Sequence, residues 1–326
     1  ERITLTPDER RQIWAQVMLY HAFKPWAVDK IAGIVQSKLE SLAQNCTLIH
    51  NARIGRKPLS YASLYLARRL GVPFVFVPYH HPRWVGWRYR EYIRLYQQAD
   101  VLIALTQAEK RTLTRLGVDE KRIFVTGNGP NIAPQADPDR FRIEASIPAN
   151  VPLILFVGQK YRYKGIAALA EAASIVWQHS PDARFVFIGP QTRFSRRFFA
   201  TQTDPRLIEL GTVDLQQKTD ALAACTMLCL PSSQESFGGV FTEAWMFRKP
   251  VIGADIPAIA EVIDDESNGY VVAPTAEALA TRIRHLLEHP NEAARLGEAG
   301  YDKTQRVYSW DILTQKTEAI YKAILG

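Results

Sequence analysis

Short apolar runs alternate along the chain with longer segments in which apolar residues recur at helical spacing. This alternation is typical of βα units whose parallel strands are buried on both faces. In the first part of the chain it predicts strands at Thr47–His50, Phe74–Val77, Val101–Leu105 and Ile123–Val125. It also predicts helices at Leu59–Leu70, Trp87–Gln98 and Gln107–Leu116, and a Thr106–Glu109 capping box marks the start of the last helix.

A second series of the same kind follows, so the sequence predicts two doubly wound α/β domains. Its strands are expected at Leu153–Val157, Phe185–Ile188, Leu207–Leu210, Met227–Leu230, Val251–Ala254 and Tyr270–Val272. Its helices are expected at Ile166–His179, Leu215–Ala224, Val240–Phe247 and Ala276–Glu288. Between the series, residues 127–148 are rich in turn formers. We therefore expect domains over 1–130 and 151–307, a linker over 131–150 and a final helical segment over 308–326.

The first domain is expected to be incomplete at its N-terminus. A doubly wound domain ordinarily begins with a strand and a glycine-rich turn. Residues 1–45 offer instead one weak strand at Arg2–Leu5, followed by aromatic-rich helical sequence. The chain also begins at Glu1 without a methionine or a signal-like segment, which indicates a fragment or a processed form.

Composition narrows the class of protein. Of the 326 residues, 47% are hydrophobic and 22% are charged, as in ordinary globular chains. No apolar run approaches the ~20 residues that cross a bilayer. Three scattered cysteines, Cys46, Cys225 and Cys229, disfavour a disulfide framework and favour a reducing compartment. A cytoplasmic location is expected, with peripheral contact at the inner membrane face as a further interpretation.

The formal net charge of +7 and the pI near 9.3 indicate an anionic partner. No long basic run, zinc-finger spacing or RNA-binding signature is present, so nucleic acid is not expected. Arg83–Arg94 interleaves arginines with aromatics, which suits an acceptor wall or anionic lipid. The simpler interpretation is an amphipathic helix with its aromatics in the core. Arg53, Arg56 and Lys57 suit either an anionic acceptor or a solvated loop.

Glu235–Glu243 is the most informative segment, because it follows a predicted strand and opens a predicted helix. Gly238 and Gly239 at the helix start let backbone N–H groups approach an anion, and the helix dipole favours negative charge there. Glu235 and Glu243 bracket that position, and carboxylates are good acceptors for sugar hydroxyls. The alternative interpretation is a helix cap with solvated glutamates.

This segment resembles the retaining glycosyltransferases of family 4, which have the GT-B fold of two facing Rossmann-like domains. Their pattern of glutamate, seven residues and glutamate is met by Glu235 and Glu243. The resemblance implies that Glu235 binds donor-sugar hydroxyls and that Glu243 binds the ribose. It also implies that four backbone amides meet the sugar and the diphosphate, those of Phe237, Gly238, Gly239 and Val240.

A second resemblance lies in residues 158–165, which follow the Leu153–Val157 strand. In the family, an arginine and a lysine in this turn clamp the donor diphosphate, and Gly158 begins the matching stretch. Lys164 and Gly165 match, but the arginine position holds the uncharged Gln159. Lys160 or Arg162 would then have to supply the second cation. The alternative interpretation is a basic, solvated turn.

Weaker similarities extend from about Cys46 to the end of the chain. Gly211 and Val213 lie in a turn that resembles the one whose backbone meets the nucleobase. His80 lies where the family carries a histidine near the transferred sugar, and a histidine there can donate to a hydroxyl. The neighbouring His81 is interpreted as a turn cap. Residues 308–326 resemble the segment that crosses back onto the first domain.

No metal or other cofactor is expected. Asp264 and Asp265 are adjacent, unlike the spaced pair of aspartates that holds a nucleotide-bound divalent ion. No histidine and cysteine cluster has the spacing of metal ligands. Cys225 and Cys229 lie in an apolar run and are expected in the core.

The expected function is metal-independent transfer of a hexose-type sugar from a nucleotide diphosphate sugar to an unidentified hydroxyl acceptor, with retention implied by the resemblance. His80, Glu235 and Lys164 are the expected catalytic residues. One alternative is a nucleotide-sugar epimerase of the same fold, which would form product without an acceptor. Another is a degenerate nucleotide-sugar binder, which Gln159 and the missing glycine-rich turn suggest.

Overall fold

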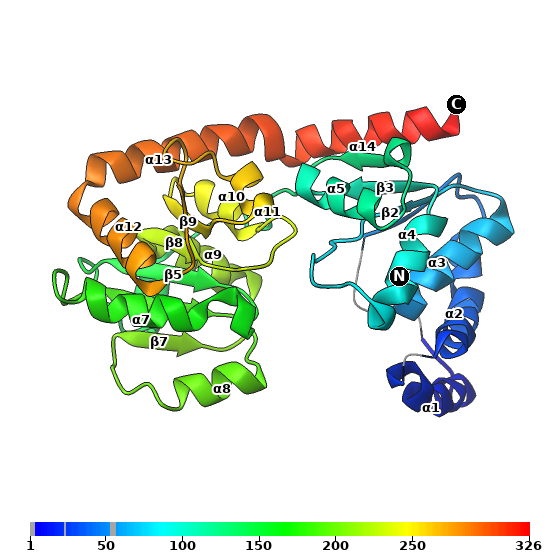
Figure 1. Ribbon diagram of the computed structural model, residues 1–326, viewed down its shortest axis with the longest axis horizontal. Helices are drawn as coiled ribbons and strands as arrows, with labels where there is room; N and C mark the ends of the chain where they lie inside the picture. Colours follow the sequence, from blue (N-terminus) through cyan, green and yellow to red (C-terminus); the bar gives the residue numbers. More distant parts are fainter. Residues whose placement is uncertain (1–3, 23, 53–56) are drawn as a thin grey trace. The chain divides into compact units, whose positions relative to one another are not determined.

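The computed structural model describes residues 4–22, 24–52 and 57–326 and divides into two compact units. Unit 1 comprises Glu1–Thr126 and Gln315–Gly326, and unit 2 comprises Gly127–Thr314. Each unit is built on a parallel sheet whose strands alternate with helices (Figure 1). The predicted α/β architecture is confirmed. The first boundary falls after Thr126, and the second falls within the last helix.

The sheet of unit 1 keeps its four strands in chain order, β1 (Ile49–Asn51), β2 (Phe74–Phe76), β3 (Val101–Ala104) and β4 (Ile123–Val125). All neighbouring pairs are parallel. Strands β2 and β3 are buried along their whole length, which explains why they are uninterrupted apolar runs in the sequence. The strands run outward in one direction, so the reversal of a doubly wound sheet is not found among the described residues of unit 1.

Helices of unit 1 connect and flank these strands. They are α1 (Pro7–His21), α2 (Pro25–Leu39), α3 (Lys57–Leu70), α4 (Arg90–Gln98) and α5 (Gln107–Arg115), with 3₁₀ turns η1 (Glu40–Leu42), η2 (Trp87–Tyr89) and η3 (Glu120–Arg122). Thr6 and Glu9 form a capping box that starts α1. Thr4 and Leu5 are not in a strand, and the rest of the predicted strand Arg2–Leu5 lies outside the described residues.

The core of unit 1 is aromatic. Helices α2 and α3 pack against each other, and Tyr61 on α3 lies in one cluster with Phe74, Phe76 and Tyr96. Tyr96 belongs to α4, whose aromatic side chains turn inward while Arg90 stays exposed. The simpler interpretation of the Arg83–Arg94 segment is therefore confirmed for its helical part. The predicted single helix over Trp87–Gln98 is an η2 turn followed by α4.

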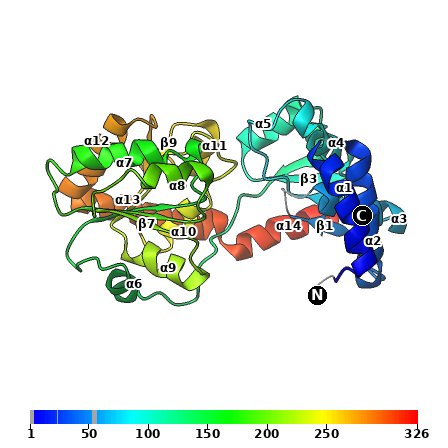
Figure 2. The same cartoon turned by 90° about the horizontal axis from the view of Figure 1, so that it is seen from below.

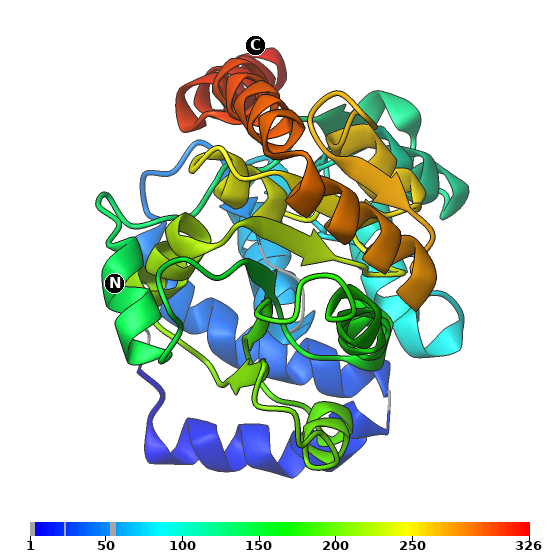
Figure 3. The ribbon, with the colours of Figure 1, turned by 90° about the vertical axis from the view of Figure 1, so that its left-hand side faces the viewer.

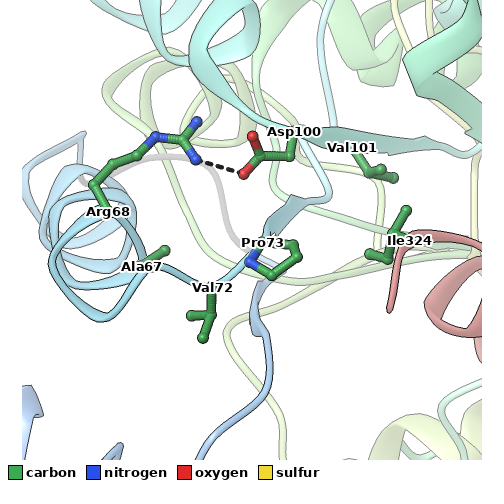
Figure 4. Close-up of a pocket in the computed structure, with 8 residues that line it drawn as sticks. Ala67, Arg68, Val72, Pro73, Asp100, Val101 and Ile324 are labelled. Atoms are coloured by element: carbon green, nitrogen blue, oxygen red, sulfur yellow. Dashed lines mark hydrogen bonds and ion pairs between the residues drawn. The ribbon is translucent and has the colours of Figure 1, made fainter. Parts of the chain in front are cut away.

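Helix α14 (Trp310–Leu325) ends in unit 1. Its Lys316 Nζ donates to the Thr126 carbonyl at 3.3 Å, and its Tyr321 hydroxyl bonds His50 Nδ1. Ile324 lines a pocket at the amino ends of β2 and β3 (Figure 4). In this pocket Asp100 pairs with Arg68 at 2.7 Å and accepts the Phe74 N–H. The carboxylate of Asp100 is therefore satisfied within the fold.

The sheet of unit 2 has the order β10-β9-β8-β5-β6-β7, and all its pairs are parallel. The strands are β5 (Leu153–Val157), β6 (Arg184–Ile188), β7 (Leu207–Leu210), β8 (Met227–Leu230), β9 (Val251–Ala254) and β10 (Tyr270–Val272). From β5 the chain moves outward to β7 and then returns to β8 on the other side of β5. The sheet is doubly wound, as predicted, and its reversal lies between β5 and β8.

Helices cover both faces of this sheet. They are α6 (Pro138–Glu144), α7 (Ile166–Val176), α8 (Arg193–Phe199), α9 (Leu215–Ala224), α10 (Val240–Trp245), α11 (Pro257–Val262), α12 (Ala276–Glu288) and α13 (Pro290–Lys303), with turns η4 (Arg162–Lys164) and η5 (Thr304–Tyr308). Helices α7 and α12 contact each other on one face, and α6 and α9 contact each other on the opposite one (Figures 2 and 3).

The segment predicted as a linker contains α6 and belongs to unit 2. Asp137 caps α6, and its backbone N–H donates to Asp220 on α9 at 2.8 Å. Arg140 Nε donates to the same Asp220 carboxylate at 2.8 Å. The buried carboxylate of Asp220 therefore orders residues that show no apolar periodicity of their own.

Two further sequence expectations concern buried sulfur and membrane spans. Cys225 and Cys229 are fully buried thiols, which confirms their place in the core. Within the residues that the structure describes, no helix has both the length and the apolar character needed to cross a bilayer.

Candidate functional site

The reversal of the unit 2 sheet brings two motifs together. Strands β5 and β8 are neighbours, so the turns at their carboxyl ends lie side by side although about 70 residues separate them in sequence. The first turn spans residues 158–165 and the second spans residues 231–239. Both are the segments that the sequence singles out, and ligands of doubly wound sheets bind at such a reversal.

Close backbone contact holds the two turns. Gly165 has a left-handed φ of 75°, and a Cβ there would lie 2.3 Å from the Pro231 carbonyl oxygen. A side chain at position 165 would therefore force the turns apart. The Ser233 N–H also donates to the Tyr163 carbonyl at 2.8 Å. These contacts fix the direction in which the following side chains point.

Lys164 and Glu235 form an ion pair across the two turns. Both side chains are largely buried, with 13% and 8% of their surface exposed. A buried carboxylate paired with an ammonium forms a strong, charge-assisted hydrogen bond. Two of the three residues that the sequence predicts to be catalytic are therefore in direct contact.

Behind this pair, the chain turns sharply into α10. Gly238 has a left-handed φ of 82°, and a Cβ at this position would lie 2.6 Å from the Phe241 ring. Phe237 is buried edge-to-face on Tyr308, with ring centroids 5.1 Å apart. Gly239 precedes the helix and Val240 is its first residue. The geometry thus requires glycine at 238 and anchors the turn by the Phe237 ring.

Glu243 lies one turn into α10 and is buried against α9. Lys218 on α9 pairs with its carboxylate at 2.8 Å and also donates to the Asn131 carbonyl at 2.7 Å. Burial raises the pKa of Glu243, while Lys218 opposes that rise. The Glu243 carboxylate is held in one place by a cation that the sequence analysis did not identify.

Lys160 does not share the position of Lys164. Its ammonium is buried beneath the turn, where it pairs with Glu209 and donates to the Leu210 carbonyl. Burial lowers the pKa of Lys160, and the Glu209 carboxylate counters this effect. In this structure Lys160 therefore holds β7 to the β5 turn. Because its ammonium points toward Glu209, the structure does not support the prediction that Lys160 supplies the second cation for the diphosphate. Gln159 and Arg162 are exposed.

Gly211 and Val213 follow β7 on the same edge of the sheet. The Gly211 carbonyl accepts the Gly189 N–H at 3.0 Å, which joins the ends of β6 and β7. The Gly211 backbone is exposed, and a Cβ there would contact nothing within 4 Å. Glycine is therefore not sterically required at position 211 in the described structure.

Gln234 is a candidate site residue that the motifs in the sequence did not indicate. Its Oε1 atom is buried and has no hydrogen-bond partner among the described residues. Buried oxygen atoms without a donor are rare in folded proteins and often mark a place for a ligand or water. Gln234 precedes Glu235 directly, so motif spacing around the glutamates was the available signal. Lys218 and Glu209 had no comparable signal, because their partners are distant in sequence.

In unit 1, His80 follows β2 and is fully buried. Its Nδ1 atom lies 3.3 Å from the Tyr96 hydroxyl, and Trp84 approaches the ring edge-to-face. The other ring nitrogen, Nε2, is buried without a hydrogen-bond partner among the residues that the structure describes. Burial lowers the pKa of His80 to about 4, so the imidazole is neutral at physiological pH.

Glu109 braces the backbone at His80. Thr106 caps α5 and accepts the Glu109 N–H at 3.1 Å, which is one half of the predicted capping box. The Glu109 carboxylate accepts the His80 N–H at 2.5 Å and the Leu105 N–H at 2.7 Å. It thereby ties the end of β2 to the end of β3. Complete burial raises the pKa of Glu109 to about 7.

The three basic residues considered for an anionic acceptor have different outcomes. Arg53 and Arg56 lie outside the described residues. Lys57 begins α3, and its ammonium lies 4.9 Å from the centre of the Tyr92 ring.

Among residues 4–22, 24–52 and 57–326, no group of three or more histidine, cysteine or acidic residues has the geometry to hold a metal ion.

Comparison with known proteins identifies both parts of the chain. Residues 137–303 match the family described as "Glycosyl transferases group 1". Residues 9–133 match the family described as "Glycosyltransferase Family 4". The first match covers the turns that follow β5 and β8, and the second match covers His80.

Curated relatives are similar over part of their length. The alpha-maltose-1-phosphate synthase of Mycolicibacterium smegmatis is 26% identical over 263 residues, which cover 70% of this chain and 64% of the relative. The D-inositol 3-phosphate glycosyltransferase of Xylanimonas cellulosilytica is 30% identical over 231 residues, which cover 65% of this chain and 54% of the relative. The alignments thus span between half and two thirds of these relatives.

Solved structures share the fold. HepE from Anabaena in complex with UDP and glucose superposes with a TM-score of 0.76 at 19% identity, covering 88% of this chain and 81% of HepE. Sucrose-phosphate synthase from Thermosynechococcus elongatus gives 0.75 at 20% identity, covering 90% and 78%. With two parallel sheets and both family matches, the chain belongs to the group 1, family 4 glycosyltransferases, which have the GT-B fold.

Proposed function

We propose that this protein transfers a hexose-type sugar from a nucleoside diphosphate sugar to a hydroxyl group of an acceptor, with retention at the anomeric carbon and without a metal ion. The observation that carries the proposal is the meeting of the β5 and β8 turns, where Lys164 contacts Glu235. UDP-glucose is the first donor to test, because HepE structures contain UDP and glucose or UDP-glucose.

In this proposal the donor replaces the resting contact between Lys164 and Glu235. The ammonium of Lys164 turns to the diphosphate, which is the stronger anion, and the Glu235 carboxylate accepts sugar hydroxyls. The buried Oε1 of Gln234 supplies a further acceptor beside Glu235. Glu243, held by Lys218, is positioned to accept the ribose hydroxyls. Each assigned side chain thus has a ligand group that matches its chemistry.

The proposed chemical step breaks the bond between the anomeric carbon and the β-phosphate oxygen. The electron pair leaves with the nucleoside diphosphate, and Lys164 together with the backbone N–H groups near Gly238–Val240 stabilises the developing charge. The acceptor hydroxyl attacks on the same face and passes its proton to the departing phosphate oxygen. The new glycosidic bond then has the configuration of the donor. Trapping of a covalent glycosyl-enzyme would contradict this step.

His80 is assigned to the sugar side of the reaction. Its neutral ring and its buried, unpartnered Nε2 support a role in hydrogen bonding rather than in proton transfer. A histidine whose pKa is about 4 is a poor general base at neutral pH. We therefore propose that His80 orients a hydroxyl group.

Calorimetric titration with UDP, GDP and ADP sugars tests the donor assignment, on wild type and on Glu243→Gln, with and without EDTA. We expect one base series to bind, Glu243→Gln to weaken it at least about tenfold, and EDTA to have no effect. A matched control is Glu298→Gln, which removes an exposed carboxylate paired with Arg248. Equal loss in both variants, or binding that EDTA abolishes, would contradict the assignment.

A second candidate function is nucleotide-sugar binding without turnover. It is motivated by Gln159 at the expected arginine position and by Lys160, whose ammonium is directed away from Lys164. The two functions differ in one measurement, the release of nucleoside diphosphate in the presence of acceptor candidates. Donor binding without any release, across hydroxyl acceptors and without acceptor, would favour the binding protein.

A further inference from the structure

Helix α1 carries an apolar surface that nothing in the described structure covers. Its half-buried side chains, including Ile13, Val17 and Tyr20, recur at helical spacing and face α2, which it contacts. A second set recurs at the same spacing on the other side of the helix. We call it the α1 stripe, and it consists of Trp14, Ala15, Met18 and Ala22. Trp14 is 80% exposed and Met18 is 78% exposed.

A second exposed apolar group lies near the C-terminal end of α1. Val85, which precedes η2, is 55% exposed, and Trp87, the first residue of η2, is 58% exposed. Lys57 connects the two regions, because its ammonium donates to the Arg88 carbonyl at 3.4 Å and lies 5.9 Å from the centre of the Tyr20 ring on α1. The α1 stripe and the η2 group thus belong to neighbouring parts of one unit.

Charge is divided unequally between the two units. Unit 1 contains 22 lysines and arginines against 11 aspartates and glutamates, a formal charge of +11. Unit 2 contains 18 against 22, a formal charge of −4. The whole excess of positive charge therefore resides in the unit that carries the α1 stripe. Arg11 extends the α1 stripe at one end, where it pairs with the exposed Asp8 at 3.6 Å, and Lys24 lies over the Trp26 ring at 5.5 Å near the other.

We propose that unit 1 docks on an anionic lipid bilayer through the α1 stripe. Tryptophan prefers the boundary between headgroups and acyl chains, since it has an apolar body and one polar N–H. Methionine adapts to irregular apolar surroundings. Basic residues around an apolar helix face add attraction to anionic headgroups. The docked helix lies in the plane of the interface and does not cross the membrane.

Charge decides between a bilayer and a second copy of the chain as the occupant. A dimer through the α1 stripe would bring together two units that each carry a formal charge of +11, and like charges oppose association. An anionic bilayer presents the opposite sign over a wide surface. The docking surface lies in unit 1 and does not depend on the proposed donor chemistry.

Vesicle flotation of the full chain tests this docking, with phosphatidylcholine vesicles compared with vesicles that also contain phosphatidylglycerol. We expect wild type to bind the anionic vesicles at least about tenfold better, and high salt to reduce the difference. The double variant Trp14→Gln/Met18→Gln should lose about tenfold of this binding. The control is Ile143→Gln, which removes an equally exposed apolar side chain, 77% exposed, from unit 2.

Several outcomes would overturn the proposal. Equal binding to both kinds of vesicle would contradict an electrostatic contribution to docking. Unchanged binding of the double variant would show that docking does not use the α1 stripe. Sedimentation that shows a wild-type dimer, lost in the double variant, would identify a second copy as the occupant. Thermal unfolding and donor titration of the double variant should match wild type, so a failure of the donor assignment is distinguishable from a failure of docking.

Discussion

At the residue scale, burial shifts two neighbouring ionisable groups in opposite senses. Burial raises the pKa of Glu109 from 4.5 to about 7 and lowers that of His80 from 6.5 to about 4. The neutral Glu109 carboxyl makes its full contribution to the free energy of unfolding below pH 4.5, and this contribution is lost as the pH rises through 7. The stability from His80 is full above pH 6.5 and is lost as the pH falls through 4. Between pH 4 and 7 the two effects therefore oppose each other.

The first prediction concerns the pH dependence of unit 1 stability. Glu109→Gln removes one of the two opposing effects, so the free energy of unfolding should increase with pH in the variant. Relative to wild type, the increase between pH 4 and 7 should approach about 3 kcal/mol. Denaturant unfolding at several pH values measures this difference. The control Glu120→Gln removes an exposed carboxylate of the same unit and should leave the pH dependence unchanged.

The second prediction concerns the uncharged position in the β5 turn. Gln159→Arg adds a cation beside the proposed diphosphate site, where Gln159 is exposed. We expect donor affinity to rise about three- to tenfold and to become more sensitive to salt. Calorimetric titration measures both changes. Gln178→Arg adds the same charge beyond the far end of α7, and an equal gain there would attribute the effect to net charge alone.

At the element scale, periodicity predicted the strands well because parallel strands buried on both faces are apolar throughout. Strands β4, β5, β7, β8, β9 and β10 begin and end where predicted. Short helices such as α8 and α11 were missed, since six or seven residues contain less than two turns of apolar periodicity. Helix α6 was missed because Asp220, far away in sequence, organises it.

The third prediction concerns the contact between the two site turns. Gly165→Ala places a Cβ against the Pro231 carbonyl in a left-handed conformation. It should lower the free energy of unfolding by at least about 2 kcal/mol and weaken donor binding. Gly211→Ala is the stability control, because a Cβ there meets open space, and its effect should stay within about 0.5 kcal/mol. Equal stability of the two variants in urea unfolding would contradict the contact.

At the scale of the whole molecule, the proposed donor-binding residues Lys164, Glu235 and Glu243 all belong to unit 2, whereas the net positive charge belongs to unit 1. Each unit has its own sheet and its own buried core, so each is expected to open as a separate cooperative region. The division of residues between the units leads to a prediction about stabilisation by ligand.

The fourth prediction is that the donor nucleotide stabilises unit 2 selectively. At a concentration about 100 times the dissociation constant, the opening free energy of β5 and β8 should rise by about 2.7 kcal/mol. That of β2 and β3 should change by less than about 0.5 kcal/mol. Hydrogen exchange measured by mass spectrometry resolves these strands. Equal protection in both units would show that both hold the nucleotide.

The sequence by itself determined the two α/β series and the position of both site turns. These features depend on local patterns, since apolar runs, glycines and glutamates keep their meaning without knowledge of their neighbours. Only the tertiary structure decided which lysine faces which carboxylate. Lys160 and Lys164 lie four residues apart in one basic turn. The directions of their side chains depend on the close packing of that turn at Gly165 against Pro231. Lys218 and Glu243 likewise meet only because α9 and α10 pack together. Side-chain direction is a property of the folded turn, and the packing of distant strands sets it.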